Sequence, residues 1–159
     1  MMRSILLPVA AVALSLAGCG RGAPKQAAGP PAAVGVYTSA ADCAASQKLD
    51  VAQCNVLIHA AIFEHQQAAN SYISLRLCEA AEGGENRCER TEGNAFRPKL
   101  QAFLVTFSAP PSAQPLYAAA AAENQLGFIS RDKSRTLLTV DETLLFSDNA
   151  KVVAEGNVH

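Results

Sequence analysis

The chain of 159 residues has room for one domain of ordinary size or two small ones. Hydrophobic residues make up 50% of it, but many are alanine and none is tryptophan, so its core would bury little area per residue and would gain from covalent crosslinks. A formal net charge of −1 and the lack of any basic run argue against a nucleic-acid-binding protein.

The N-terminus has the form of an export signal followed by a lipid attachment site. Arg3 supplies a positive charge, and residues 5–16 are an apolar run too short to span a bilayer. The run ends in Leu-Ala-Gly-Cys, which is similar to the lipobox of bacterial lipoproteins. We expect residues 1–18 to be a lipoprotein signal peptide and Cys19 to carry acyl chains such as palmitate, enough for stable membrane anchoring. The alternative is an ordinary secretory signal in which Cys19 is incidental.

The segment after Cys19 is expected to be a tether. Gly20 stands where lipoproteins retained in the inner membrane commonly carry aspartate, which favours the outer membrane of a Gram-negative envelope, facing the periplasm. Residues 19–36 are rich in Gly, Pro and Ala and cannot offset the entropy of ordering by burial, so they are predicted to be flexible. Residues 37–159 are predicted to form one globular domain, helical over 37–92 and β-rich over 96–159.

A Tyr-x-Ser-x-x-x-Cys unit occurs twice, at residues 37–43 and 72–78, and a further cysteine follows each copy. An exported chain occupies an oxidising compartment, where the four cysteines other than Cys19 favour disulfides. Four cysteines permit three pairings, and the repeat favours one local bridge per copy. The predicted bridges are Cys43–Cys54 and Cys78–Cys88.

Capping residues predict the helices of the first half. Ser39 and Ser74 are good N-caps for short helices, and Asp50 with Gln53 forms a capping box at the start of a longer one. Gly83, next to a second glycine, is a suitable stop for the last of them. The predicted helices cover residues 40–46, 51–69 and 75–81.

The long helix has one clear apolar face that includes His65. A histidine in such a place is expected to be a hydrogen-bonded structural residue, and a hydrolytic group with Glu64 is the alternative. Phe63 and Val56 lie on the opposite side of the helix. Either the C-terminal sheet covers this side as well, or Phe63 is exposed and marks a partner surface.

The second half changes to a strand pattern. Residues 101–107 alternate, with Phe103, Val105 and Phe107 on one face, and the prolines that follow are expected to break the chain. The alanine run 118–122 is compatible with a short helix or a loop. Further strands are predicted at residues 126–130, 135–140, 143–147 and 151–154. We therefore predict an α+β fold, in which a small disulfide-stapled helical half with the two Tyr-x-Ser-x-x-x-Cys units precedes a short antiparallel β meander.

These units, together with FRPKLQAFLV at residues 96–105 and PLY at 115–117, resemble the uncharacterised YgiB/YjfM-like bacterial lipoproteins. The resemblance extends over roughly residues 36–118. In that family the Tyr-x-Ser-x-x-x-Cys units recur and are followed by a Pro-containing segment and a strand. The resemblance implies an envelope lipoprotein associated with biofilm formation, and it brings no catalytic residues.

The sequence offers little for catalysis or metal binding. Zinc sites favour cysteines two to four residues apart, unlike the spacing here, and there is no Cys-x-x-Cys motif, phosphate-binding loop or nucleophile elbow. We expect no enzyme activity, no cofactor and no metal.

An acidic cluster surrounds the second pair of cysteines and is either a solvated surface or a contact for a cationic partner such as a polyamine or a basic protein. The expected function is that of a non-catalytic envelope lipoprotein that acts as a protein-interaction or biofilm-related cell-surface module, with a membrane anchor, an envelope protein partner and no nucleic acid. The alternative is a small-ligand-binding accessory lipoprotein serving an envelope enzyme or transporter. The candidate interaction residues are Phe63, Val56, Glu79, Glu82 and Glu85; Glu89 and Glu92 complete the cluster.

Overall fold

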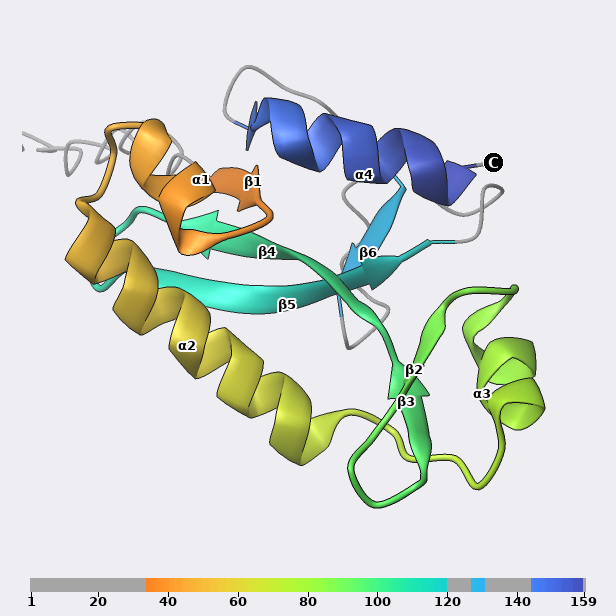
Figure 1. The fold of residues 1–159 in the computed structure, drawn as a ribbon. Coiled ribbons are helices and arrows are strands. Elements are labelled where there is room, and N and C mark those ends of the chain that lie inside the picture. The colour runs from red at the N-terminus through yellow and green to blue at the C-terminus, as the bar shows by residue number, and fades with distance from the viewer. Residues whose placement is uncertain (1–33, 120–126, 131–143, 159) are drawn as a thin grey trace, which may run out of the picture.

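The computed structural model describes residues 34–119, 127–130 and 144–158, and these form three layers with a five-stranded sheet in the middle (Figure 1). Helices α1 and α2 cover one face of the sheet and α4 covers the other. The predicted α+β class is therefore confirmed. In chain order the elements are β1 (Val34–Tyr37), α1 (Ala40–Ala45), α2 (Val51–Ala68), α3 (Leu75–Glu82), β2 (Cys88–Arg90), β3 (Phe96–Pro98), β4 (Leu100–Thr106), β5 (Ser112–Ala118), β6 (Phe128–Ser130), β7 (Leu144–Phe146) and α4 (Asp148–Val158).

The three helices predicted in the first half are confirmed, and their caps explain where they begin. The Ser39 Oγ accepts a hydrogen bond from the Asp42 N–H at 3.1 Å, and Ser74 caps α3 in the same way. At α2 the Asp50 carboxylate accepts from the Gln53 N–H at 2.7 Å, while the Gln53 side chain accepts from the Asp50 N–H at 3.1 Å. Helix α3 ends at Gly83, whose φ of 83° is a left-handed conformation that glycine adopts without steric cost.

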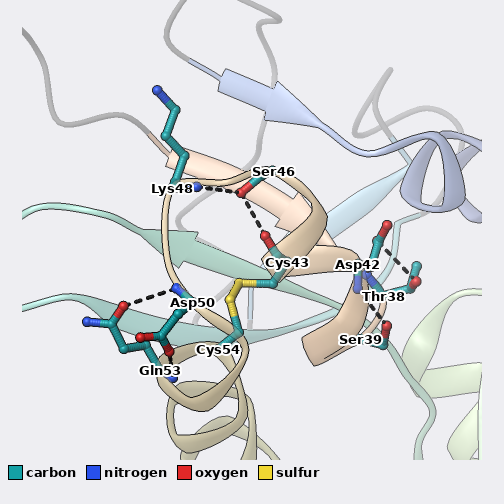
Figure 2. The surroundings of a disulfide bond; sticks show 9 residues. All are labelled: Thr38, Ser39, Asp42, Cys43, Ser46, Lys48, Asp50, Gln53 and Cys54. Atoms are coloured by element: carbon teal, nitrogen blue, oxygen red, sulfur yellow. Dashed lines mark hydrogen bonds between the residues drawn. A yellow bond between two sulfur atoms is a disulfide. The ribbon is translucent and has the colours of Figure 1, made fainter.

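Both predicted disulfides are present. Cys43 of α1 is bonded to Cys54 in the first turn of α2, with the Cα atoms 6.0 Å apart, and Figure 2 shows this bridge between the capped starts of the two helices. Cys78 of α3 is bonded to Cys88 of β2, with the Cα atoms 6.2 Å apart. Each Tyr-x-Ser-x-x-x-Cys unit thus consists of an extended tyrosine, a serine N-cap and a short helix held by a disulfide.

The central sheet has the strand order β6-β5-β4-β1-β7. Strands β4, β5 and β6 form an antiparallel meander, of which the sequence prediction lacks β5, and β1 joins it antiparallel to β4. Strand β7 lies parallel to β1, so the sheet is mixed and not purely antiparallel. A separate two-stranded hairpin, β2 with β3, carries α3 beside it at the end of the molecule remote from α1 (Figure 1).

The side chains of strand β4 belong to two hydrophobic cores, one on each face of the sheet. Phe103 and Val105 pack with Tyr37 and with residues of α1 and α2, as the alternation predicts, whereas Ala102 and Leu104 pack against α4 on the other face. All four of these β4 residues are buried because helices cover both sides. The α1/α2 core includes the bridge Cys43–Cys54, and the α4 core includes Val36, Leu116, Phe128, Ala150 and Ala154.

Two predictions are wrong at the ends of the described chain. Val34–Val36 were assigned to the tether, but they belong to β1, where Val36 is fully buried between β4 and β7. Residues 151–154 were assigned to a strand, but they lie in α4. Ala150 and Ala154, four residues apart, face the sheet, and the Ser147 Oγ accepts from the Ala150 N–H at 3.0 Å, which starts a helix.

The other strand predictions for the second half of the chain have mixed outcomes. The strands predicted at 126–130 and 143–147 correspond to β6 and β7, and the one at 135–140 lies outside the described residues. Strand β5 was missed, since its Pro115 indicates a break. Within the described residues β6 pairs only with Leu116–Ala118, so no described strand needs a hydrogen bond from Pro115 on that side of β5. The short β2–β3 hairpin was also missed.

Candidate functional site

A cavity of about 540 Å³ lies at the C-terminal end of α2, bordered by strands β5 and β6 and by the end of α3. This volume is in the range of small-molecule sites in proteins. The apolar part of its wall comes from Ala68, Ala69, Pro98, Pro115 and Ile129. Its polar part comes from Glu64, Asn70, Glu82, Gln114, Tyr117 and Ser130.

The second Tyr-x-Ser-x-x-x-Cys unit places one carboxylate of this wall. After α2 the chain turns and Tyr72 pairs with Phe96, with backbone hydrogen bonds of 2.8 Å in each direction. The Tyr72 hydroxyl then donates to the Glu82 Oε1 at 2.9 Å. Burial and this hydrogen bond raise the pKa of Tyr72, so the phenol keeps its proton and remains a donor. Glu82 is therefore held in place at the cavity.

A chain of polar side chains lies behind another part of the wall. The His65 Nδ1 is 3.0 Å from the hydroxyl oxygen of Tyr117, which lines the cavity. The His65 Nε2 is 3.5 Å from the Glu89 Oε1, and the Arg97 Nε donates to the same oxygen at 2.7 Å. His65 itself is buried in the apolar face of α2, at 2% exposure.

The protonation state of His65 follows from its surroundings. Burial is the main cause that lowers its pKa, the positive charge of Arg97 adds to the effect, and Glu89 acts in the opposite direction. The ring is therefore neutral near pH 7. Because a carboxylate only accepts, the Nε2–H faces Glu89 and the Nδ1 accepts from the Tyr117 O–H. At 3.5 Å the contact with Glu89 is electrostatic more than a hydrogen bond. The result is a fixed orientation for Tyr117.

The predicted interaction residues fall in two different places. Val56 and Phe63 are 69% and 63% exposed on the outer face of α2, so of the two alternatives for this face the exposed one holds. Of the acidic residues, Glu82 lines the cavity, whereas the Glu79 Oε1 accepts from the Asn86 N–H at 3.0 Å. Glu85 is exposed beyond the end of α3. Neither Val56 nor Phe63 lines the cavity.

No motif in the sequence indicates the cavity itself. Tyr117 lies next to Pro115 in a segment interpreted as broken chain, and Gln114 and Ser130 carry no motif. Glu64 and His65 were considered together, but the structure joins His65 to Tyr117 and Glu89. The one sequence feature near the cavity is Asn70. It stands at the end of the predicted long helix, just before the second Tyr-x-Ser-x-x-x-Cys unit.

The described residues contain neither a metal-binding cluster nor a membrane-spanning helix. No three His, Cys, Asp or Glu side chains in ranges 34–119, 127–130 and 144–158 are grouped so that they would hold a metal ion. Within the same ranges, no helix has the length and apolar character needed to cross a membrane.

Comparison with known proteins gives one match. The model of the family described as "Protein of unknown function (DUF1190)" matches residues 31–143, which is more than half of the chain. No curated protein and no solved structure matches the chain. The matched range contains both Tyr-x-Ser-x-x-x-Cys units, both disulfides and all the residues named above as lining the cavity.

Proposed function

We propose that this chain, which belongs to the DUF1190 family of proteins of unknown function, is a non-catalytic lipoprotein of the bacterial cell envelope. It is of the YgiB/YjfM-like kind, anchored through Cys19 in the outer membrane and facing the periplasm. It acts there as a module that binds an envelope protein partner, in a cell-surface or biofilm-related role. The lipobox-like residues 16–19 support the anchor. The two disulfides support an oxidising compartment outside the cytoplasm.

The observation that carries the proposed binding role is the outer face of α2. Solvent-facing sides of helices normally carry charged residues, but the 18 residues of α2 include a single Asp, Glu, Lys or Arg, which is Glu64. Val56 and Phe63 lie two turns apart with Ala60 between them, and all three are exposed. Protein interfaces are depleted of charge in their centres and enriched in aromatic side chains. The partner surface is therefore expected to be uncharged and apolar as well.

The anchor limits where this partner is found. Strand β1 begins at Val34, 15 residues after Cys19. A chain of this length reaches at most ~50 Å when fully extended. The exposed face of α2 is therefore available to membrane-bound proteins or to periplasmic proteins near the same membrane.

A matched pair of substitutions tests the binding role. Val56 on α2 and Val152 on α4 are both 69% exposed, so Val56→Glu and Val152→Glu add the same charge at sites where folding tolerates it. We expect Val56→Glu and Phe63→Glu to abolish a complex that the wild-type protein and Val152→Glu retain. The measurement is native electrophoresis of detergent extracts, combined with photo-crosslinking from positions 56 and 63.

Two results would contradict the proposal. One is a complex that survives both α2 substitutions. The other is equal loss of the complex with Val152→Glu, because the effect would then come from added charge and not from the face of α2. Crosslinks from positions 56 and 63 must also lead to the same partner.

The cavity favours a second candidate function, small-ligand binding in the service of an envelope enzyme or transporter. A volume of about 540 Å³, with polar groups from α2, α3, β5 and β6 and apolar groups between them, has the composition of a ligand site. The cavity and the outer face of α2 have no lining residue in common among those named here, so the two functions are compatible.

A further inference from the structure

We propose that the partner bound by the outer face of α2 is a second copy of this chain, and that the two α2 helices pack antiparallel across a two-fold axis near Ala60. This inference rests on the proposed binding role of that face and names its partner. Four properties of the face lead to it: its exposure, its lack of charge, the sizes of its side chains and its area.

The outer face of α2 is a continuous stripe along the helix. Helix α2 packs on β4 and β5 with one side, and the opposite side lies at the outside of the molecule (Figure 1). The stripe consists of residues at intervals of three or four, which places them on the same side of a helix: Ala52, Val56, Ala60, Phe63 and Gln67. All five are exposed, including the two large apolar side chains of Val56 and Phe63. The stripe is therefore long enough to contact another helix over several turns.

The charge of this face suits a partner with the same face. A two-fold axis brings one surface patch against an identical patch, so any net charge on the patch would meet charge of its own sign. Glu64 is the single Asp, Glu, Lys or Arg of α2, and it lies on the side of the helix that lines the cavity. The five residues of the stripe carry no such charge, so two copies meet without electrostatic repulsion.

The sizes of the side chains favour the antiparallel arrangement. Ala60 lies close to midway between Val56 and Phe63 along the helix. In an antiparallel pair with the axis near Ala60, Val56 of each copy lies against Phe63 of the other, and the small Ala60 side chains let the helices approach closely. A parallel pair would set Phe63 against Phe63 and hold the helices apart at that end. Antiparallel helices also place the positive end of each dipole beside the negative end of the other.

The area of the face indicates a partner on the same membrane. A helix of 18 residues is about 27 Å long and about 10 Å wide, so one face of it covers roughly 300 Å². Stable complexes of freely diffusing proteins bury about 800 Å² on each partner. A smaller contact is enough when both partners are held near each other, because a shared attachment raises their effective concentration.

A second copy of this chain meets that condition. It carries the same proposed lipid attachment site at Cys19, and its strand β1 likewise begins 15 residues after Cys19. Its α2 therefore has the same reach from the membrane, so the two faces meet at the same distance from it. A partner that diffuses freely in the periplasm lacks this advantage.

The experiment follows a crosslink near the axis in intact membranes, where both copies are anchored. Two full-length copies with different C-terminal affinity tags are co-expressed, and each carries Ala60→Cys. We expect a disulfide-linked dimer that contains both tags on non-reducing gels. Val152→Cys, at an exposed position on α4, is the matched control and is expected to give no such dimer.

Added charges then test which residues meet. With Ala60→Cys in both copies, Val56→Glu in both is expected to abolish the crosslink. Val56→Lys in one copy and Phe63→Glu in the other should restore a dimer with both tags, because these positions meet across the axis and their charges attract. Val56→Glu in one copy and Phe63→Glu in the other should not restore it, because like charges then meet.

The contrary results have different meanings. Equal crosslinking from Ala60→Cys and Val152→Cys would overturn the inference, because the crosslink would then reflect random collision. Restoration by Val56→Lys with Val56→Glu, and not with Phe63→Glu, would mean parallel helices and would overturn the antiparallel arrangement. If the dimer with both tags is absent but photo-crosslinks from positions 56 and 63 lead to another protein, the second copy is overturned and the proposed function stands. If neither product forms, both fall.

Discussion

The two disulfides have nearly the same loop length but are expected to differ in their effect on stability. Cys43 and Cys54 are separated by 11 residues, Cys78 and Cys88 by 10. In the chain-entropy description each bridge contributes about 3 kcal/mol to the free energy of unfolding, with a difference of only about 0.1 kcal/mol between them. Any larger difference must come from what each bridge does in the folded protein.

The folded surroundings of the bridges differ. Cys43 and Cys54 are both fully buried in the core that contains Tyr37 and Phe103. Cys78 is buried too, but Cys88 is only half-buried, and neither belongs to the cores of the central sheet. Replacing the first pair by alanine removes two sulfur atoms from a packed core, which costs about 1–2 kcal/mol beyond the loop term.

The test compares the double variants Cys43→Ala/Cys54→Ala and Cys78→Ala/Cys88→Ala. Equilibrium unfolding in urea, followed by circular dichroism, should show a loss about 1–2 kcal/mol larger for the first. Hydrogen exchange should show faster local exchange in α3 for the second, because α3 packs on the β2–β3 hairpin and not on the sheet. Equal or reversed losses of stability would mean that the second bridge supports the core as much as the first, and the reasoning from burial would be wrong.

Two further predictions concern the anchor and the buried histidine. Intact-mass analysis of the membrane fraction should show loss of residues 1–18 and added acyl mass on Cys19, and Cys19→Ser should release the protein from membranes; an unmodified wild-type chain in the soluble fraction would contradict the anchor. The pKa of His65 in the folded protein lies below its ordinary value of 6.5, so the unfolded state binds more protons once the pH falls below about 6.5 and stability should decline from there towards lower pH. His65→Gln should reduce this decline in urea unfolding measured between about pH 5 and pH 7.5, and an unchanged slope would contradict the assignment to His65.

The helices and disulfides were predictable because their signals are local. Ser39, Asp50 and Ser74 are capping residues that act on the next three residues of the chain. The pairing of cysteines followed from a repeated unit whose two copies have nearly the same length. Neither inference depended on how distant parts of the chain meet.

The edges of the sheet were not predictable because they depend on contacts between distant parts of the chain. Strand β1 is short and follows a Gly/Pro/Ala-rich stretch, and only its pairing with β4 and β7 makes it a strand. Lys151-Val152-Val153-Ala154 has the β-branched residues of a strand, but Ala150 and Ala154 pack on the sheet and the Asp42 carboxylate accepts from Asn149 at 3.0 Å and from Ser147 at 2.5 Å. The hydrogen bonds come from Asp42, more than 100 positions away, and together with the packing on the sheet they override the local preference.

The cavity depends even more on contacts between parts of the chain that are far apart in the sequence. Glu64, Glu82, Tyr117 and Ser130 come from four different elements, and only the fold brings them to one wall. The acidic cluster was visible in the sequence, but the sequence does not distinguish its members. The structure separates Glu82, which lines the cavity, from Glu79, which accepts a backbone hydrogen bond, and from the exposed Glu85.

The repeated unit is used in two ways, and this follows from where each copy lies. Tyr37 is 2% exposed and part of the core, so the first copy holds α1 and α2 on the sheet. Tyr72 is half-buried and its hydroxyl fixes Glu82, so the second copy holds α3 and the β2–β3 hairpin against the cavity. Because the second copy contributes no residue to the two cores on the sheet, substitutions in it are expected to leave the packing of those cores unchanged.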